Sequence, residues 1–222
     1  MQISFYVILV LILLWLAFRY YRLEKKIIRA VKRNFDMISA IASIVDRVEG
    51  YNKDHAKEVT EIALKIAQKT SMASSSEQLL SLEMASKLHD IGMLMVMNDL
   101  IKSRQSLRGD HVFLMKIHTL LAENYLKQEL GLTDEIPSII RWHHERWDGF
   151  GYPDSLKGIQ IPLQSRILAI ADSISAMRSQ RNYRRKQYKT NEEIITELKS
   201  QAGLQFDPNL VNITISLLEK EE

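Results

Sequence analysis

The stretch Leu88-His89-Asp90-Ile91-Gly92 places a histidine beside an aspartate within an otherwise apolar run, residues 82–96. Neighbouring side chains on a helix point about 100° apart, since each turn takes roughly 3.6 residues. Imidazole and carboxylate groups are both good ligands for divalent metals, and both side chains can still reach one metal beside the helix. Taken alone, however, the pair is better explained as a helix end, with Asp90 as a local cap and Gly92 as the stop. The rest of the chain has to decide between these interpretations.

Apolar residues recur at spacings of three and four along most of the chain, a pattern that predicts helices. We predict that Asp54 and Asp110 cap two of these helices. The predicted helices begin near residue 34, after Asp54 and after Asp110, and others span residues 79–96, 136–142, 167–177, 191–202 and 208–218. No run predicts a strand of convincing length, so the expected fold is all-α, a helical bundle packed around inward-facing apolar stripes.

Five of the six histidines lie where an apolar residue or a buried helix end is expected. Each one alone is better explained as a core histidine with a hydrogen-bond partner. Five such explanations would have to hold independently, and an unpartnered buried polar group costs about 1–3 kcal/mol. A metal centre supplies a partner that all of them can share. With two aspartates, the candidate ligands are His55, His89, Asp90, His118, His143, His144 and Asp172. Seven ligands exceed the four of a structural zinc site and suit two metals bridged by a carboxylate.

The chain has 222 residues and no cysteine. Its length and its apolar fraction of 46% fit one ordinary domain with additional segments. Without cysteine there is neither a disulfide nor a thiolate metal site, so His, Asp and Glu must hold any metal. The net charge of +3 comes from residues 19–34, which carry seven basic side chains and one acidic. Because the remainder is net acidic, we do not expect the domain to bind a nucleic acid polymer.

Residues 3–18 carry no charged side chain, and Trp15, Tyr20 and Tyr21 fit an interfacial aromatic belt. A membrane span needs about 20 residues, with a lower limit near 17. A cleaved signal peptide, the rival interpretation, has basic residues before its apolar run, whereas here they all follow it. We therefore predict an uncleaved transmembrane helix in residues 1–21, with its C-terminal side in the cytoplasm.

Residues 22–34 are predicted to form a basic juxtamembrane linker, and residues 35–222 the metal-binding domain. The basic linker is expected to contact anionic lipids of the bilayer, although a plain solvated face explains it as well. A homodimer through the anchor and the first domain helix is a further hypothesis.

The order and spacing of the candidate ligands resembles the HD-GYP domain, a subgroup of the HD metal-dependent phosphohydrolases. The resemblance runs from about Phe35 to Leu217 and includes Asp148-Gly149-Phe150-Gly151-Tyr152-Pro153. It also covers residues 143–148 (His-His-Glu-Arg-Trp-Asp) and residues 156–162 (Leu-Lys-Gly-Ile-Gln-Ile-Pro). The His-Asp pair alone is a weak signal, whereas the combined order is specific.

The resemblance implies an all-helical fold with two or three metal ions, usually iron or manganese. It implies hydrolysis of the bacterial second messenger cyclic di-GMP to pGpG or GMP, at the bacterial inner membrane if the anchor is real. All seven candidate ligands would hold metal, with His89 and Asp90 as the catalytic pair and Asp90 as the bridge. The family's phosphate-contacting positions fall on Arg181 and Arg184, which could otherwise form a solvated basic loop. Gly151, Tyr152 and Pro153 would shape the pocket wall and contact diguanylate-cyclase (GGDEF) proteins.

The sequence departs from the family pattern at four positions, where Met93 replaces a lysine, Tyr51 and His111 each replace a glutamate, and Ser175 replaces an acid. Because the residue at Tyr51 adds the third metal ligand in the family, we expect two metals. Met93 and Ser175 motivate an alternative, a module that binds a cyclic dinucleotide or a protein without turnover. An HD hydrolase acting on another phosphoester is the remaining alternative, and the complete Gly-Tyr-Pro loop argues against it.

Overall fold

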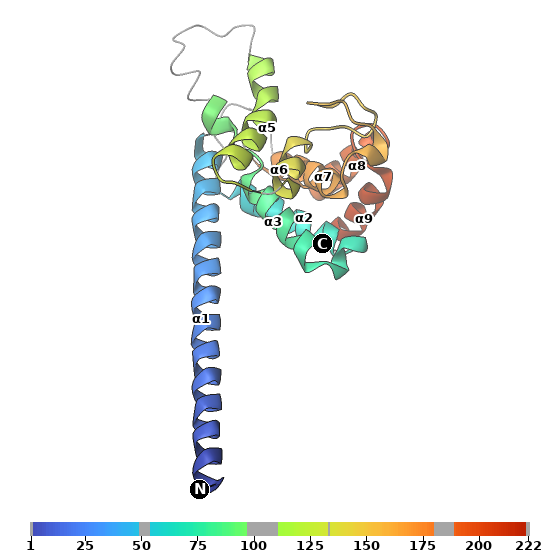
Figure 1. Ribbon diagram of the computed structural model, residues 1–222. Coiled ribbons are helices and arrows are strands. Elements are labelled where there is room, and N and C mark those ends of the chain that lie inside the picture. Colours follow the sequence, from blue (N-terminus) through green and yellow to red (C-terminus); the bar gives the residue numbers. More distant parts are fainter. Residues whose placement is uncertain (1, 49–53, 97–110, 133, 180–188, 221–222) are drawn as a thin grey trace. The chain divides into compact units, whose positions relative to one another are not determined.

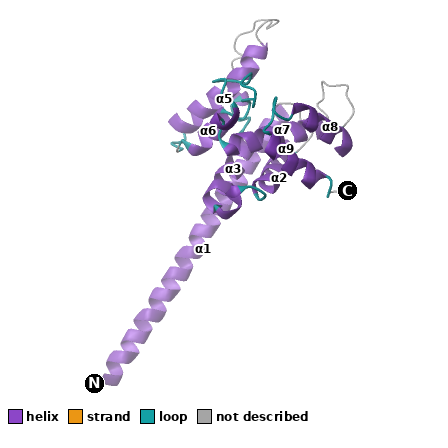
Figure 2. Ribbon diagram, turned by 90° about the vertical axis from the view of Figure 1, so that its right-hand side faces the viewer, coloured by secondary structure: helices purple, strands orange, loops and turns teal. Residues whose placement is uncertain are grey.

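The computed structural model describes residues 2–48, 54–96, 111–132, 134–179 and 189–220, and helices dominate them (Figure 1). The α-helices are α1 (Gln2–Val48), α2 (His55–Ala67), α3 (Ser76–Leu88), α5 (His111–Gln128), α6 (Glu135–Arg141), α7 (Leu163–Arg178), α8 (Asn191–Gln201) and α9 (Pro208–Leu218). Two short 3₁₀-helices are η1 (Ser71–Ser74) and η2 (Gly158–Gln160). No strand occurs within the described residues, where an isolated bridge joins Ala202 and Phe206 (Figure 2). The predicted all-α fold is therefore confirmed.

The chain divides into two units, Met1–Ala40 and Ile41–Glu222. Helix α1 is continuous from Gln2 to Val48 and belongs partly to each unit. The predicted boundaries after residues 21 and 34 both fall inside this helix and stay predictions.

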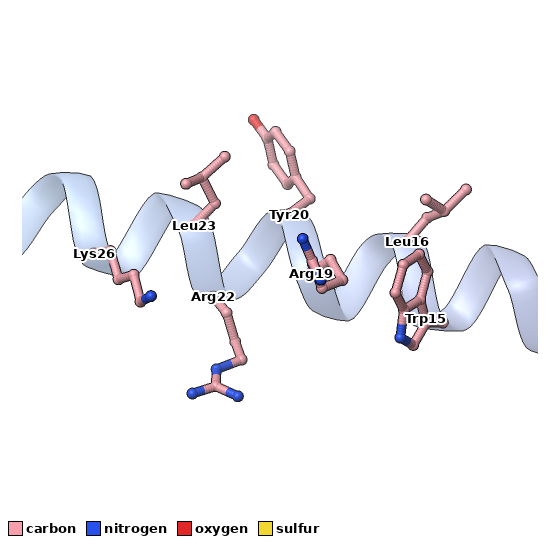
Figure 3. Close-up of a pocket in the computed structure, with 7 residues that line it drawn as sticks. All are labelled: Trp15, Leu16, Arg19, Tyr20, Arg22, Leu23 and Lys26. Atoms are coloured by element: carbon pink, nitrogen blue, oxygen red, sulfur yellow. The ribbon is translucent and has the colours of Figure 1, made fainter.

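Side chains of α1 form two neighbouring stripes between residues 15 and 26 (Figure 3). One stripe consists of Leu16, Tyr20 and Leu23, and the other of Trp15, Arg19, Arg22 and Lys26. The guanidinium of Arg19 lies 5.1 Å from the centre of the Trp15 ring, one turn earlier. This cation–π spacing places charge and aromatic surface together on an exposed helix. Within the part of the chain that the structure describes, no helix is both long and apolar enough to cross a membrane. The anchor therefore stays a prediction.

The core of the second unit lies where α2 packs against α3 and α7. On α2, Val59, Ala63 and Ile66 are fully buried, at the spacing of four and three that puts them on one helix face. Fully buried partners from α3 and α7 are Leu82, Ala85, Ile167, Ile170 and Ile174. Helix α6 in turn packs against α3, α5 and α7. This packing brings five helices, α2, α3, α5, α6 and α7, close to one another.

The first turn of α2 is held by an aspartate that the sequence did not indicate. Asp54 stands at the cap position with a left-handed backbone (φ 70°), and its side chain makes no capping hydrogen bond. The predicted cap by Asp54 is therefore wrong, and Asp110, the other predicted cap, lies outside the described residues. Instead the buried carboxylate of Asp46, on α1, accepts the N–H of Ala56 at 3.2 and 3.3 Å. Burial raises the pKa of Asp46, and the Ala56 hydrogen bond opposes this shift.

The predicted helix over residues 79–96 is interrupted. Helix α3 starts at Ser76, where the Ser75 hydroxyl accepts the N–H of Gln78, and ends at Leu88. A turn follows, in which the N–H of Ile91 donates to the carbonyl of Leu88 and that of Met93 donates to Asp90. The uninterrupted helix was wrong because the apolar run continues across this turn, so hydrophobic pattern alone cannot locate it.

Candidate metal centre

All seven candidate ligands come together from five segments of the second unit. His55 is the first residue of α2, and His89 and Asp90 occupy the turn after α3. His118 lies on α5, His143 and His144 follow α6, and Asp172 lies on α7. Two groups form, one of His55, His89 and Asp172 and the other of His118, His143 and His144. Within each group the ligand atoms lie within 4.8 Å of one another.

Asp90 lies between the two groups. Its Oδ2 is 2.9 Å from Nε2 of His89, and its Oδ1 is 3.5 Å from Nε2 of His118. One carboxylate oxygen therefore faces each group, which is the arrangement that a bridging ligand needs. Asp172 faces the first group alone, with Oδ1 3.3 Å from Nε2 of His55 and 3.9 Å from Nε2 of His89.

Four of the five imidazoles are buried, that of His144 is half-buried, and the rings contact one another. Ring centres of His89 and His143 lie 5.4 Å apart, and those of His143 and His144 lie 4.0 Å apart. His89 and His143 are each 1% exposed. Five closely packed imidazoles contribute no apolar packing that Leu or Ile would not supply better, so the cluster points to a common cation rather than to a core.

Hydrogen bonds at Nδ1 orient three of these rings. Nδ1 of His89 donates to the carbonyl of Ser86 at 2.8 Å, and Nδ1 of His143 donates to Ile140 at 2.6 Å. When His89 and His143 are neutral, this leaves the lone pair of each ring on Nε2, the nitrogen that faces the other ligands. Nε2 of His143 is buried and has no hydrogen-bond partner among the described residues. Such a donor set fits a divalent cation.

A hydroxyl relay orients His55. Its Nδ1 lies 2.9 Å from Oγ of Ser175, and that hydroxyl donates to Oε2 of Glu58 at 2.7 Å. Because the hydroxyl proton points to Glu58, the hydroxyl accepts from Nδ1–H of His55. Ser175, which stands where the family has an acid, therefore still serves the site: it links His55 to Glu58, an acid in the first turn of α2.

Burial and neighbouring charges hold three of the candidate ligands, Asp90, His143 and His144, in the protonation states that metals bind. Burial lowers the pKa of His143 well below its usual range, and neighbouring His144 adds to this. Burial, then His118, lowers the pKa of His144 to about 3. Burial raises the pKa of Asp90, but His89 outweighs it, so the pKa is lowered well below 3.8. The Asp90 carboxylate is thus ionised, and the His143 and His144 rings are neutral.

His89 behaves differently from the other imidazoles. Burial lowers its pKa, but the charge and hydrogen bond of Asp90 outweigh this and raise the pKa to about 10. Asp90 and Asp172 together thus attract one positive charge to this position. A divalent cation would provide that charge, and His89 would give up its proton when it binds the cation.

A cavity of about 250 Å³ lies beside the second group. Of the predicted substrate contacts, Gly151 and Tyr152 line it, together with His143 and His144, whereas Pro153 does not. The Tyr152 ring lies 5.0 Å from that of His144. Burial, followed by the charge of Asp90, raises the pKa of Tyr152 above its usual range, so the hydroxyl remains a donor. Arg181 and Arg184 lie outside the described residues.

Glu145 holds the loop that carries Gly151 and Tyr152. Its buried carboxylate accepts the N–H of Asp154 at 2.7 Å and that of Leu156 at 3.0 Å. Asp154 also accepts from Arg141 at 2.7 and 2.8 Å, which ties the loop to α6. This role of Glu145 is not among the roles predicted from the sequence. Its position directly after His143-His144 was the available signal.

The other positions that depart from the family pattern either do not line the cavity or have side chains outside the described part of the structure. Met93 is 5% exposed and does not line the cavity, so this position contributes apolar packing. Tyr51 lies outside the described residues, and His111 begins α5 with its side chain outside the description. The expectation of two metals rather than three stays a prediction.

Replacing Ser175 with alanine is expected to weaken metal affinity about 10- to 100-fold, the usual effect of losing the partner that orients a histidine ligand. His55 would lose its acceptor at Nδ1, and Glu58 its donor. Competition between the protein and a metallochromic chelator measures the change. Ser216→Ala, at an exposed hydroxyl on α9, is the matched control. Equal affinities for Ser175→Ala and wild type would contradict the role given to the relay.

Comparisons with known proteins agree with this geometry. A sequence profile described as "HD domain" matches residues 36–210. The cyclic di-GMP phosphodiesterase response regulator RpfG of Xanthomonas campestris pv. campestris is 30% identical, over 82% of this chain and 47% of its own length. The 3'3'-cGAMP-specific phosphodiesterase 2 of Vibrio cholerae is 30% identical, over 79% of this chain and 34% of its own length. The chain thus spans less than half the length of either relative.

A solved structure shows the same fold. The crystal structure of a cyclic GMP-AMP specific phosphodiesterase of V. cholerae superposes with a TM-score of 0.63 at 21% identity. The superposition covers 82% of this chain and 48% of the other.

Proposed function

This chain belongs to the HD domain family, and from that premise we propose that it hydrolyses cyclic di-GMP, to pGpG or GMP, at a centre of two divalent cations. The relative named a cyclic di-GMP phosphodiesterase response regulator supports the substrate. The single observation that carries the proposal is the position of Asp90, with one carboxylate oxygen toward each of two groups of three ligands.

We propose that His55, His89 and Asp172 hold one cation, that His118, His143 and His144 hold the other, and that Asp90 bridges them. When bound, two such cations lower the pKa of water and stabilise charge on the attacking and leaving oxygens of a phosphoryl group. Nitrogen and oxygen donors without thiolate suit iron or manganese. Buried hydrogen bonds at Nδ1 fix the rings of His89 and His143 before a metal ion arrives, so little reorganisation of these side chains accompanies metal binding.

The rest of the site serves the substrate. The Tyr152 hydroxyl, kept protonated by its surroundings, is available to donate to a phosphate oxygen. Arg181 and Arg184 are proposed to offset phosphate charge. The loop that carries Pro153 contributes Gly151 and Tyr152 to one wall of the pocket, and we propose that its outer surface contacts GGDEF proteins.

A second cyclic dinucleotide is a reasonable alternative substrate. The V. cholerae relative named a 3'3'-cGAMP-specific phosphodiesterase is as similar to this chain, at 30% identity, as the relative named for cyclic di-GMP. The two dinucleotides differ only in one base, so metal binding and phosphate contacts serve both equally.

The experiment is hydrolysis by the full chain, purified without oxygen and loaded with iron or manganese. Cyclic di-GMP, 3'3'-cGAMP and a small phosphodiester are supplied in parallel, and a chelator provides the metal-free control. Chelator-sensitive production of pGpG or GMP is the expected result. Faster turnover of 3'3'-cGAMP would favour the alternative substrate. Tight binding of cyclic di-GMP in calorimetry without product would favour a binding module instead, and turnover of the small phosphodiester alone would favour a hydrolase of another class.

We further propose that residues 1–21 anchor the chain in the bacterial inner membrane, with the metal-binding domain in the cytoplasm. Support comes from the uncharged residues 3–18 and from the basic side chains that follow them. Full-length protein is expected to stay with membranes during alkaline extraction, whereas a chain lacking residues 2–18 is released. Release of the full-length protein would contradict the anchor. Crosslinking in the same membranes tests the homodimer.

A further inference from the structure

The cavity beside the second ligand group has few positive charges for a substrate with two phosphates. Among the described residues that line it, the Lys and Arg side chains are Lys116 and Arg146. Arg146 already forms an ion pair with Asp148, since its Nε and Nη2 donate to the Asp148 carboxylate at 3.0 and 2.6 Å. Lys116 forms no such ion pair: no carboxylate in the described part of the chain lies within ion-pairing distance of its ammonium group.

Lys116 is held at the site by its place on α5 and by an aromatic ring. It precedes the candidate ligand His118 by two residues, so the helix that carries the ligand also carries the charge. Its Nζ lies 5.6 Å from the centre of the Tyr152 ring, within cation–π range. That ring in turn lies 5.0 Å from His144. The ammonium group therefore stands over the aromatic wall of the pocket, close to the second group.

Met93 stands where the family pattern has a lysine. It carries no charge, is buried and does not line the cavity, so it cannot supply a positive charge to the pocket. An ammonium group exposed to the pocket on one side and supported by an aromatic face on the other is suited to a phosphate oxygen. We propose that Lys116 binds a phosphodiester group of the cyclic dinucleotide and thereby takes over the charge that Met93 lacks. This inference rests on the proposed function and names one further residue that binds its substrate.

The test is Lys116→Met in the full, metal-loaded chain. Loss of one charge-assisted hydrogen bond is expected to raise KM for cyclic di-GMP about 10- to 100-fold, while metal content stays at the wild-type level. Lys116→Arg is expected to recover most of the affinity. Lys127→Met is the matched control, since Lys127 lies on the same helix but pairs with Glu123 and Asp134. It is expected to leave KM unchanged.

The outcomes separate this inference from the proposed function. Wild-type turnover with an unchanged KM in Lys116→Met would overturn the role of Lys116 and leave the function standing. If the wild type binds cyclic di-GMP without hydrolysing it, the proposed function fails, and a 10- to 100-fold weaker Kd for Lys116→Met in calorimetry still supports the inference. A wild type that neither binds nor hydrolyses the dinucleotide overturns both. Loss of metal from Lys116→Met would show a structural role and overturn the inference as well.

Discussion

Asp90→Asn is expected to lower hydrolysis of cyclic di-GMP by about 10³-fold or more and to reduce bound metal to one equivalent or less per chain. A metal ion contributes several kcal/mol of charge stabilisation to the transition state, and this is lost with the ion. Each 1.36 kcal/mol in the activation free energy is worth about tenfold in rate. Asparagine keeps the shape of aspartate but replaces one anionic oxygen with an NH₂ group. That group would face either Nε2 of His89 or Nε2 of His118, where a ligand oxygen now lies.

Metal analysis and the hydrolysis assay on the same preparation check this expectation. Asp134→Asn is the matched control, because the Asp134 side chain is 87% exposed and forms an ion pair with Lys127 on the surface. It should retain both metals and full turnover. An Asp90→Asn chain with two metals and wild-type turnover would show that Asp90 does not bridge, and would remove the observation on which the proposed function rests.

Gly92→Ala is the second change with a large expected effect. A Cβ at this position would lie 2.0 Å from the carbonyl oxygen of His118 and 2.8 Å from its carbonyl carbon. Both atoms belong to the backbone of α5, which cannot rotate away as a side chain could. We expect a loss of about 3 kcal/mol in the free energy of unfolding, at the upper end for overpacking. The turn with His89 and Asp90 would also separate from His118, so metal content should fall.

Denaturant unfolding and metal analysis check both parts of this expectation. Gly131→Ala is the comparison, since nothing lies within 4 Å of its Cβ position and only its left-handed backbone (φ 61°) opposes a side chain. It should cost about 1–2 kcal/mol and leave the metals in place. Equal losses in the two variants would mean that the turn does not depend on close packing against α5.

The sequence was sufficient to predict the seven residues that come together, because each carries its own local signal. His55 and His118 replace apolar residues at inward positions of regular helices, and such positions converge when helices pack into one core. The cost of burying five imidazoles without partners then indicated a shared metal centre, and the resemblance to a family agreed with it. The helical structure of these segments was predictable for the same reason, since the spacing of apolar residues indicates which face of a helix is buried.

Features that depend on one specific long-range contact could not be predicted. The capping of α2 by Asp46 is an example, because nothing local distinguishes Asp46 from the adjacent, more obvious candidate Asp54. The break after Leu88 lies inside a continuous apolar run, and the close contact of Gly92 with α5 becomes visible only when the helices are packed. The contact of Lys116 with Tyr152, whose ring centre lies 5.6 Å from Nζ, also joins residues that are far apart in the sequence.

The Asp46 contact has a practical consequence for recombinant fragments. A fragment beginning at residue 54 would contain every candidate ligand, yet it would lack the carboxylate that accepts the N–H of Ala56, directly beside His55. Loss of such a cap costs about 1 kcal/mol and would loosen the turn that carries the first ligand. A fragment beginning at residue 41 would retain Asp46. The shortest useful expression product is therefore set by a residue that belongs to the preceding helix and binds no metal.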